Sequence, residues 1–161
     1  MKLRYGVEMK QPVDKLPGFI AQIIKATGEL VNVTDRDGTL AIVQTSEEAN
    51  KLALFYEKKG MLESTFSLFQ LNPNSTLYGS FSDYGFISRS DVPYLFVETT
   101  IPFTITDGDE TQIRMAKMQM EEDFLAIEPS VSNIYYVDHH KKELLEGYAR
   151  AYGIKVTFLC E

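Results

Sequence analysis

The sequence has one cysteine, Cys160, and no tryptophan among its 161 residues. A single thiol cannot form an intramolecular disulfide, so the sequence excludes a disulfide-stapled secreted scaffold. The first ten residues lack the apolar core of a signal peptide, and no stretch approaches the roughly 20 apolar residues of a membrane-spanning helix. We therefore expect a cytoplasmic protein that does not enter a membrane.

Clustered positive charge is also missing. Sixteen Lys and Arg residues stand against 23 Asp and Glu, the net charge is −7, and the basic residues are scattered apart from Lys58-Lys59 and Lys141-Lys142. Nucleic acids and anionic membranes are bound mainly through clustered Lys and Arg. The sequence therefore predicts neither of these partners.

Several catalytic signatures are absent as well. The chain has no G-x-G-x-x-G, G-x-x-x-x-G-K-[ST], G-x-S-x-G or C-x-x-C motif. It has two histidines, and Cys160 is the penultimate residue of a predicted strand, which is a poor place for a nucleophile paired with a base. We predict no catalytic residue and favour a binding protein over an enzyme.

What is present is an ordinary globular composition, with 44% hydrophobic and 24% charged residues. The length predicts one α+β domain spanning residues 1–161. Within residues 1–71 the patterns alternate as strand, helix, strand, strand, helix, strand, which is the order of a ferredoxin-like βαββαβ unit. The predicted strands are 3–9, 31–33, 40–43 and 62–71, and the helices run from near Pro12 to Gly28 and from Ser46, as N-cap, to Gly60.

The patterns in residues 76–161 predict a second unit, with the element order ββαβαβ. Its strands are 77–81, 94–105, 134–137 and the C-terminal end; Asp107 caps the first helix, whose apolar face reaches Ile127, and Gly153 ends the second. Strands that alternate with helices favour parallel pairing through right-handed crossovers. We therefore expect a mixed sheet covered by helices.

Polar side chains follow two of these strands. Asp107 and Asp109 come after the first, and Asp138, His139 and His140 after the second. If the strands are parallel, these groups meet at one edge and could bind a divalent metal such as Mn²⁺ or Mg²⁺, or Zn²⁺ through the imidazoles. Alternatively, Asp107 and Asp138 cap helices, the histidines are surface residues and no cofactor binds.

The run Val137-Asp138-His139-His140 resembles the Asp-His-His motif of the DHH phosphoesterase superfamily. The resemblance covers these four residues. That family places further metal ligands in an earlier motif with a histidine and paired aspartates, whereas this chain has no histidine before position 139. The resemblance implies a metal-dependent phosphoester or nucleotide hydrolase, which is the alternative function, and it assigns no catalytic role to any residue here.

A polar loop between residues 80 and 93 is the other candidate site, with Tyr84, Arg89 and Asp91 as predicted binding residues, because such loops carry function more often than cores do. Three methionines, Met115, Met118 and Met120, could form an adaptable groove, but we expect them to fill gaps in the core. The leading prediction is a non-enzymatic binding or protein–protein interaction module. Its partner would be another protein or a second copy, as for an oligomer subunit or a phage or mobile-element structural or inhibitor protein.

Overall fold

The computed structural model describes residues 1–11 and 14–159. Pro12 and Cys160, which the sequence predicted in a helix start and a strand end, lie outside the described residues. The described chain is α+β, with four α-helices and two antiparallel sheets, and it divides into two compact units. The N-terminal unit comprises Lys2–Gln70 and Ile87–Val92, and the C-terminal unit comprises Met1, Leu71–Phe86 and the described residues from Pro93 onward.

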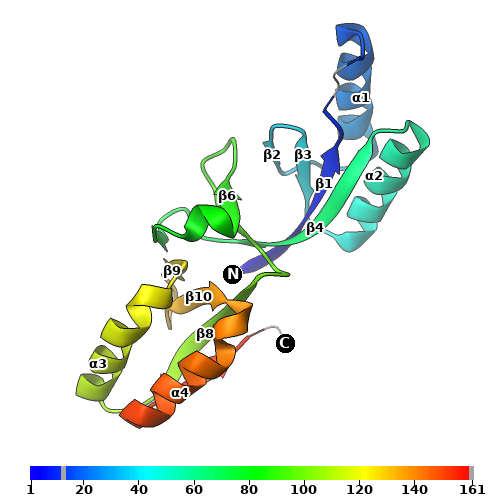
Figure 1. Ribbon diagram of the computed structural model, residues 1–161. Coiled ribbons are helices and arrows are strands. Elements are labelled where there is room, and N and C mark those ends of the chain that lie inside the picture. Colours follow the sequence, from blue (N-terminus) through cyan, green and yellow to red (C-terminus); the bar gives the residue numbers. More distant parts are fainter. Residues whose placement is uncertain (12–13, 160–161) are drawn as a thin grey trace. The chain divides into compact units, whose positions relative to one another are not determined.

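The N-terminal unit follows the order strand, helix, strand, strand, helix, strand that the sequence predicted. Its strands pair antiparallel in the order β2-β3-β1-β4, and α1 and α2 lie on the same face of this sheet (Figure 1). Val7, Val43 and Leu52 are fully buried between the helices and the sheet. The elements are β1 (Lys2–Met9), α1 (Pro17–Leu30), β2 (Asp35–Asp37), β3 (Leu40–Val43), α2 (Ser46–Lys58) and β4 (Leu62–Gln70).

Three elements of this unit lie at slightly different residues than the sequence predicted. The strand predicted at residues 31–33 is formed instead by β2, because the hairpin closes through a tight turn at Gly38, whose φ of 56° suits glycine. Helix α1 begins at Pro17, with proline in its first turn. Thr45 caps α2 in place of Ser46, since its side chain accepts a hydrogen bond from Glu48 N at 3.1 Å.

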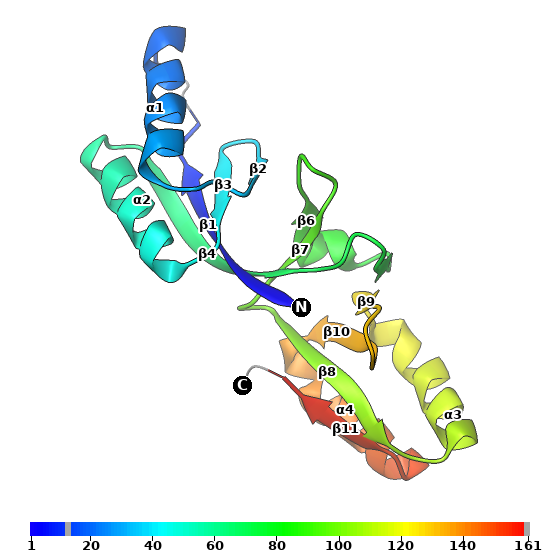
Figure 2. The same cartoon turned by 180° about the vertical axis from the view of Figure 1, so that it is seen from behind.

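The C-terminal unit has its own sheet, of order β11-β8-β10-β9-β5, with α3 and α4 side by side on one face (Figure 1 and Figure 2). Phe103, Phe124 and Tyr135 form an aromatic cluster between helices and sheet. The elements of this sheet and its helices are β5 (Thr76–Leu77), β8 (Thr100–Asp107), α3 (Glu110–Met120), β9 (Ala126–Glu128), β10 (Ile134–Asp138), α4 (Lys142–Tyr152) and β11 (Lys155–Phe158). Two further strands, β6 (Gly85–Ile87) and β7 (Pro93–Phe96), precede β8.

The predicted parallel pairing, and with it the mixed sheet, was wrong. Strand β10 runs antiparallel to β8, with Asp138 opposite Thr100 and Tyr136 opposite Pro102. The antiparallel direction results from β9, a strand within residues that were predicted to continue the apolar face of the helix to Ile127. Helix α3 returns the chain to β9, and the reversal that follows β9 sends β10 back between β8 and β9.

The two units therefore share one plan. In each, a strand and a helix lead to a second strand, and the third strand turns back beside the first. A second helix then leads to the fourth strand, which pairs with the other side of the first. The resulting orders, β2-β3-β1-β4 and β9-β10-β8-β11, are equivalent. No helix in the described part of the chain has the length and apolar character needed to cross a membrane.

Candidate functional site

Asp138 ends β10, and a 3₁₀ turn, His139–Lys141, leads from it into α4. Its Oδ1 accepts a hydrogen bond from His140 N at 2.8 Å, so the carboxylate caps this turn. The capping role predicted for Asp138 is confirmed. Because a cap fixes the direction in which the chain leaves the strand, it also places the two side chains that follow.

Both imidazoles lie against the Asp138 carboxylate. The Nδ1 atoms of His139 and His140 are 3.8 Å and 3.2 Å from Asp138 Oδ1, and the ring centroids are 3.9 Å apart. One ligand atom from each residue can be chosen so that all three lie within 4.8 Å of one another. The Asp138 side chain is 20% exposed, against 40% for His139 and 80% for His140, so the cluster opens to solvent from a half-buried base.

Tyr84 completes the cluster from a distant part of the chain. Its hydroxyl donates a 2.5 Å hydrogen bond to Asp138 Oδ2, across 54 residues of sequence. The tyrosine follows the 3₁₀ turn Phe81–Asp83, and its own carbonyl accepts a hydrogen bond from Phe96 N at 2.9 Å. Tyr84 thus holds one carboxylate oxygen and leaves the other facing the imidazoles.

The protonation states of Asp138 and Tyr84 follow from their geometry. Partial burial by itself raises the pKa of Asp138, but hydrogen bonds from the Tyr84 hydroxyl and the His140 N–H, together with the two imidazoles, outweigh it and lower the pKa below the usual 3.8. The same hydrogen bond, followed by burial, raises the pKa of Tyr84 above 10.0. The pair is therefore a carboxylate and a neutral phenol at neutral pH.

An ion pair anchors the end of the turn. Lys141 Nζ lies 2.5 Å from Asp123 Oδ1, and this contact is the main reason that the pKa of Lys141 is raised. Asp123 closes the 3₁₀ turn that follows α3, Glu121–Asp123. The turn that carries the histidines is thus held at both ends, by Asp138 and by Lys141.

Asp107 and Asp109 do not reach this cluster. Because β10 is antiparallel to β8, Asp138 pairs with Thr100, and Asp107 lies seven residues further along β8, about 23 Å away. The prediction that these aspartates converge on one metal was wrong. Asp109 instead caps α3 by accepting from Thr111 N and Gln112 N, the role that the sequence had assigned to Asp107.

The three residues predicted from the loop belong to different units. Tyr84 belongs to the C-terminal unit, whereas Arg89 and Asp91 lie in the turn between β6 and β7 that belongs to the N-terminal unit. Asp91 is exposed with a left-handed φ of 60°, a conformation that aspartate tolerates better than most residues. Arg89 lines a pocket of the N-terminal unit.

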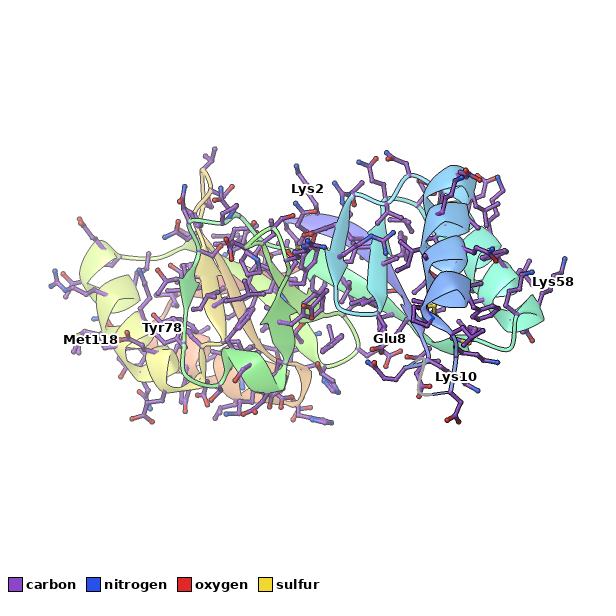
Figure 3. All side chains as sticks on the ribbon, turned by 90° about the horizontal axis from the view of Figure 1, so that it is seen from above. Lys2, Glu8, Lys10, Lys58, Tyr78 and Met118 are labelled. Carbon is purple, nitrogen blue, oxygen red and sulfur yellow. The ribbon has the colours of Figure 1, made fainter. Side chains whose placement is uncertain are left out.

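A groove of about 440 Å³ runs along α3 in the C-terminal unit, and Figure 3 shows two residues that line it, Tyr78 and Met118. The expectation that the methionines fill the core holds for Met120, which is fully buried. It was wrong for Met115 and Met118, which are 47% and 70% exposed. The helical pattern places these two on the outer side of α3, and Met118 reaches the groove.

The donor atoms of the Asp138 cluster suit a transition metal better than Mg²⁺. Two imidazole nitrogens and one carboxylate oxygen match Zn²⁺, Co²⁺ or Ni²⁺, whereas Mg²⁺ and Mn²⁺ prefer oxygen. Ligands about 2.1 Å from a tetrahedral metal lie about 3.4 Å apart. Asp138 Oδ1 lies 3.2 Å and 3.8 Å from the two Nδ1 atoms, and ligand atoms of all three residues lie within 4.8 Å of one another. Searches against protein-family models, curated proteins and solved structures gave no significant match.

Proposed function

We propose that the chain is a non-enzymatic binding module whose C-terminal unit binds a transition metal ion through Asp138, His139 and His140. The observation that carries the proposal is the convergence of three ligand atoms within 4.8 Å on a carboxylate already oriented by Tyr84. Hydrogen-bonding partners behind metal ligands commonly fix the ligand and strengthen the site. Tyr84 supplies such a partner without contacting the metal position itself.

Binding is favoured over hydrolysis for a chemical reason. Three protein ligands leave at least one coordination position open, which suits a water, a partner side chain or a substrate. A hydrolase also needs a group that moves a proton to or from the attacking water. The two other carboxylates predicted for the metal site lie away from the cluster, Asp107 at the far end of β8 and Asp109 as the cap of α3. The open position therefore favours a ligand supplied by the binding partner.

The fold is compatible with a binding module and with many other activities. We infer that both units are ferredoxin-like, because each has the βαββαβ order and the sheet order of fourth, first, third and second strand. This architecture hosts unrelated functions, so it assigns none by itself. The proposal rests on the Asp138 cluster alone.

Titration of the metal-free protein with Co²⁺ and Zn²⁺ tests the proposal. We expect one Co²⁺ per chain with visible absorption bands, displacement by Zn²⁺, and a higher melting temperature. Free metal at 100 times the dissociation constant should add about 2.7 kcal/mol of stability. Asp138→Asn or the double variant His139→Ala/His140→Ala should abolish the bands.

Asp107→Asn is the matched control, because it makes the same chemical change after a strand of the same sheet. It should bind Co²⁺ like the wild type. The proposal fails if the wild type binds no Co²⁺ at millimolar concentration. It also fails if Asp138→Asn and Asp107→Asn bind equally well, since the metal would then lie elsewhere.

Self-association is the second candidate function, favoured by the exposed apolar groove along α3. Both apolar side chains and charged side chains of both signs line it. These residues are Tyr78, Ile113, Met118, Phe124 and Ile127, with Glu110, Arg114, Lys117 and Glu121. A surface that carries both positive and negative charges can pair with the same surface of a second copy across a two-fold axis. The proposed occupant of the groove is therefore a second chain.

Light scattering across a range of protein concentrations tests this second candidate. A two-fold dimer should dissociate on dilution, and Met118→Glu should make it monomeric, because a charge would be buried at the contact. Met115→Glu is the matched control, because Met115 is an exposed methionine on the same helix that does not line the groove. A wild-type chain that stays monomeric at millimolar concentration excludes the self-association proposal and leaves the metal proposal untouched.

A further inference from the structure

A second site lies in the N-terminal unit, where no function was expected apart from a role for Arg89. The chain between α1 and β2 and the turn at residues 87–92 enclose a pocket of about 430 Å³. Two arginines, Arg36 and Arg89, reach it from these separate segments. Further polar lining residues are Asn32, Thr34 and Ser90, and apolar ones are Val31 and Val33.

Two hydrogen bonds hold the segments together. Ser88 Oγ donates to Asp35 Oδ2 at 2.5 Å across 53 residues, and Arg89 N donates to Arg36 O at 2.9 Å. Asp35 is 8% exposed, and its other oxygen accepts from Arg36 N at 2.8 Å. The two arginines are thus fixed at neighbouring backbone positions before any ligand arrives, which reduces the entropy lost on binding.

The charge balance of the pocket favours an anion. Among the residues that the structure describes, no carboxylate lies within ion-pairing distance of either guanidinium. The lining carboxylate, Asp35, is engaged by Ser88 and by Arg36 N. Glu48, which does not line the pocket, accepts a hydrogen bond through Oε2 from Asn32 N at 2.9 Å. Two arginines without a carboxylate partner among the described residues therefore line a pocket in a chain of net charge −7.

We propose that this pocket binds a small-molecule phosphomonoester. A guanidinium presents a planar fork of donors that matches phosphate oxygens, and two of them balance the dianion that a phosphomonoester carries near neutral pH. The Ser90 hydroxyl and the Asn32 side-chain amide add uncharged donors, whereas the Thr34 hydroxyl already donates to Ile42 O at 3.1 Å. Val31 and Val33 give the rest of the ligand an apolar wall, and the volume lies within the range of small-molecule pockets.

Amide chemical-shift mapping of the full chain tests this assignment with inorganic phosphate, AMP and adenosine as probes. At about 10 mM, where a millimolar site is mostly filled, phosphate and AMP should shift the resonances of residues 31–36 and 89–90. AMP should bind more tightly than phosphate because of the apolar wall, and adenosine should bind more weakly than either. Equal affinity for adenosine and AMP would overturn the phosphate assignment.

Arg36→Gln and Arg89→Gln should each weaken AMP binding about tenfold, and the double variant should remove it, because each loses a charged hydrogen-bond donor. Both keep the backbone hydrogen bonds that build the pocket, so a retained amide spectrum shows that the unit still folds. Arg150→Gln, on α4, removes the same charge elsewhere and should bind normally. Absence of shifts in the wild type, or equal losses in Arg150→Gln and the pocket variants, overturns the proposal.

Discussion

The two units place different chemistry at the same point of the same fold. In the N-terminal unit the third strand ends at Val43, and Thr45 caps a helix with Glu47 and Glu48 in its first turn. Carboxylates at this end stabilise a helix through its dipole. In the C-terminal unit the third strand leads through His139–Lys141 to α4, which lacks a side-chain cap.

The difference teaches that local rules for a helix start account more fully for the N-terminal junction than for the C-terminal one. The N-terminal unit follows the rules for a helix start, with a hydroxyl cap and acidic residues after it. The C-terminal unit has His139, His140 and Lys141 between Asp138 and α4, and Asp138 is held by Tyr84. Helix α4 has Glu143 in its first turn but no side-chain cap. Departures from local rules occur where function requires them, which is consistent with a metal site at this junction.

The largest expected effect is the loss of stability when a tightly packed glycine in each unit is replaced by alanine. A Cβ on Gly85 would lie within 3 Å of Tyr94 O, a backbone atom that cannot rotate away. Gly85→Ala should therefore cost about 3 kcal/mol or more, measured by urea unfolding. In the N-terminal unit a Cβ on Gly6 would lie 2.9 Å from Leu40 Cδ1, the end of a flexible side chain. Gly6→Ala should cost only about 1 kcal/mol, and equal losses would contradict this contrast.

The next effect distinguishes the proposed metal ligands from Tyr84, the residue that holds the Asp138 carboxylate. Tyr84→Phe leaves Asp138 and both histidines in place but removes the 2.5 Å hydrogen bond to Oδ2. Loss of such a partner weakens metal sites by about tenfold or more. Calorimetric titration with Zn²⁺ should show that decrease with unchanged stoichiometry, and unchanged affinity would remove Tyr84 from the site.

Much of the fold could be predicted from the sequence, because helix and strand periods and turn residues are local signals. The N-terminal unit was predicted in element order on this basis. The direction of β10 could not be predicted in the same way, because it depends on the presence of β9. The three residues of β9, Ala126–Glu128, continue the apolar spacing of α3 and so resemble an extension of that helix. The available signal was the stretch Pro129–Asn133, whose proline, serines and asparagine are typical of a turn between two strands.

The site was only partly predictable for the same reason. Asp138, His139 and His140 are adjacent in sequence, so a motif reveals them. Tyr84 was predicted as a binding residue, but its contact with Asp138 spans 54 residues and has no local signature. The pairing of Arg36 with Arg89 likewise depends on a contact between distant segments. Only tertiary structure brings such groups together.

A smaller effect tests the cap of the N-terminal unit. Thr45→Ala removes the side-chain acceptor for Glu48 N and should cost about 1 kcal/mol in thermal or urea unfolding. Thr45→Asp keeps an acceptor at this position and is the matched control, so it should restore most of the loss. A neutral Thr45→Ala would show that the junction in the N-terminal unit owes its stability to packing instead.

The smallest effect is the pH dependence of the Tyr84–Asp138 pair. The pKa of Asp138 is lowered from 3.8, so its contribution to stability is present above that pH and is lost as the pH falls through the lower folded-state value. The pKa of Tyr84 is raised from 10.0, so its contribution is present below pH 10 and is lost as the pH rises through the higher folded-state value. The metal-free wild type should therefore exceed Tyr84→Phe in stability by about 1 kcal/mol on a plateau between these limits. The difference should shrink below about pH 4 and above about pH 10.

Tyr78→Phe is the matched control for this profile. The Tyr78 hydroxyl reaches Glu121 Oε1 at 3.4 Å on the exposed groove, and burial is the main reason that its pKa is raised. Because a 3.4 Å contact to an exposed carboxylate is weak, the stability difference should be smaller and flat through the acid range. If both variants give the same acid dependence, the Asp138 carboxylate is not held by Tyr84, and the two junctions differ only in their helix caps.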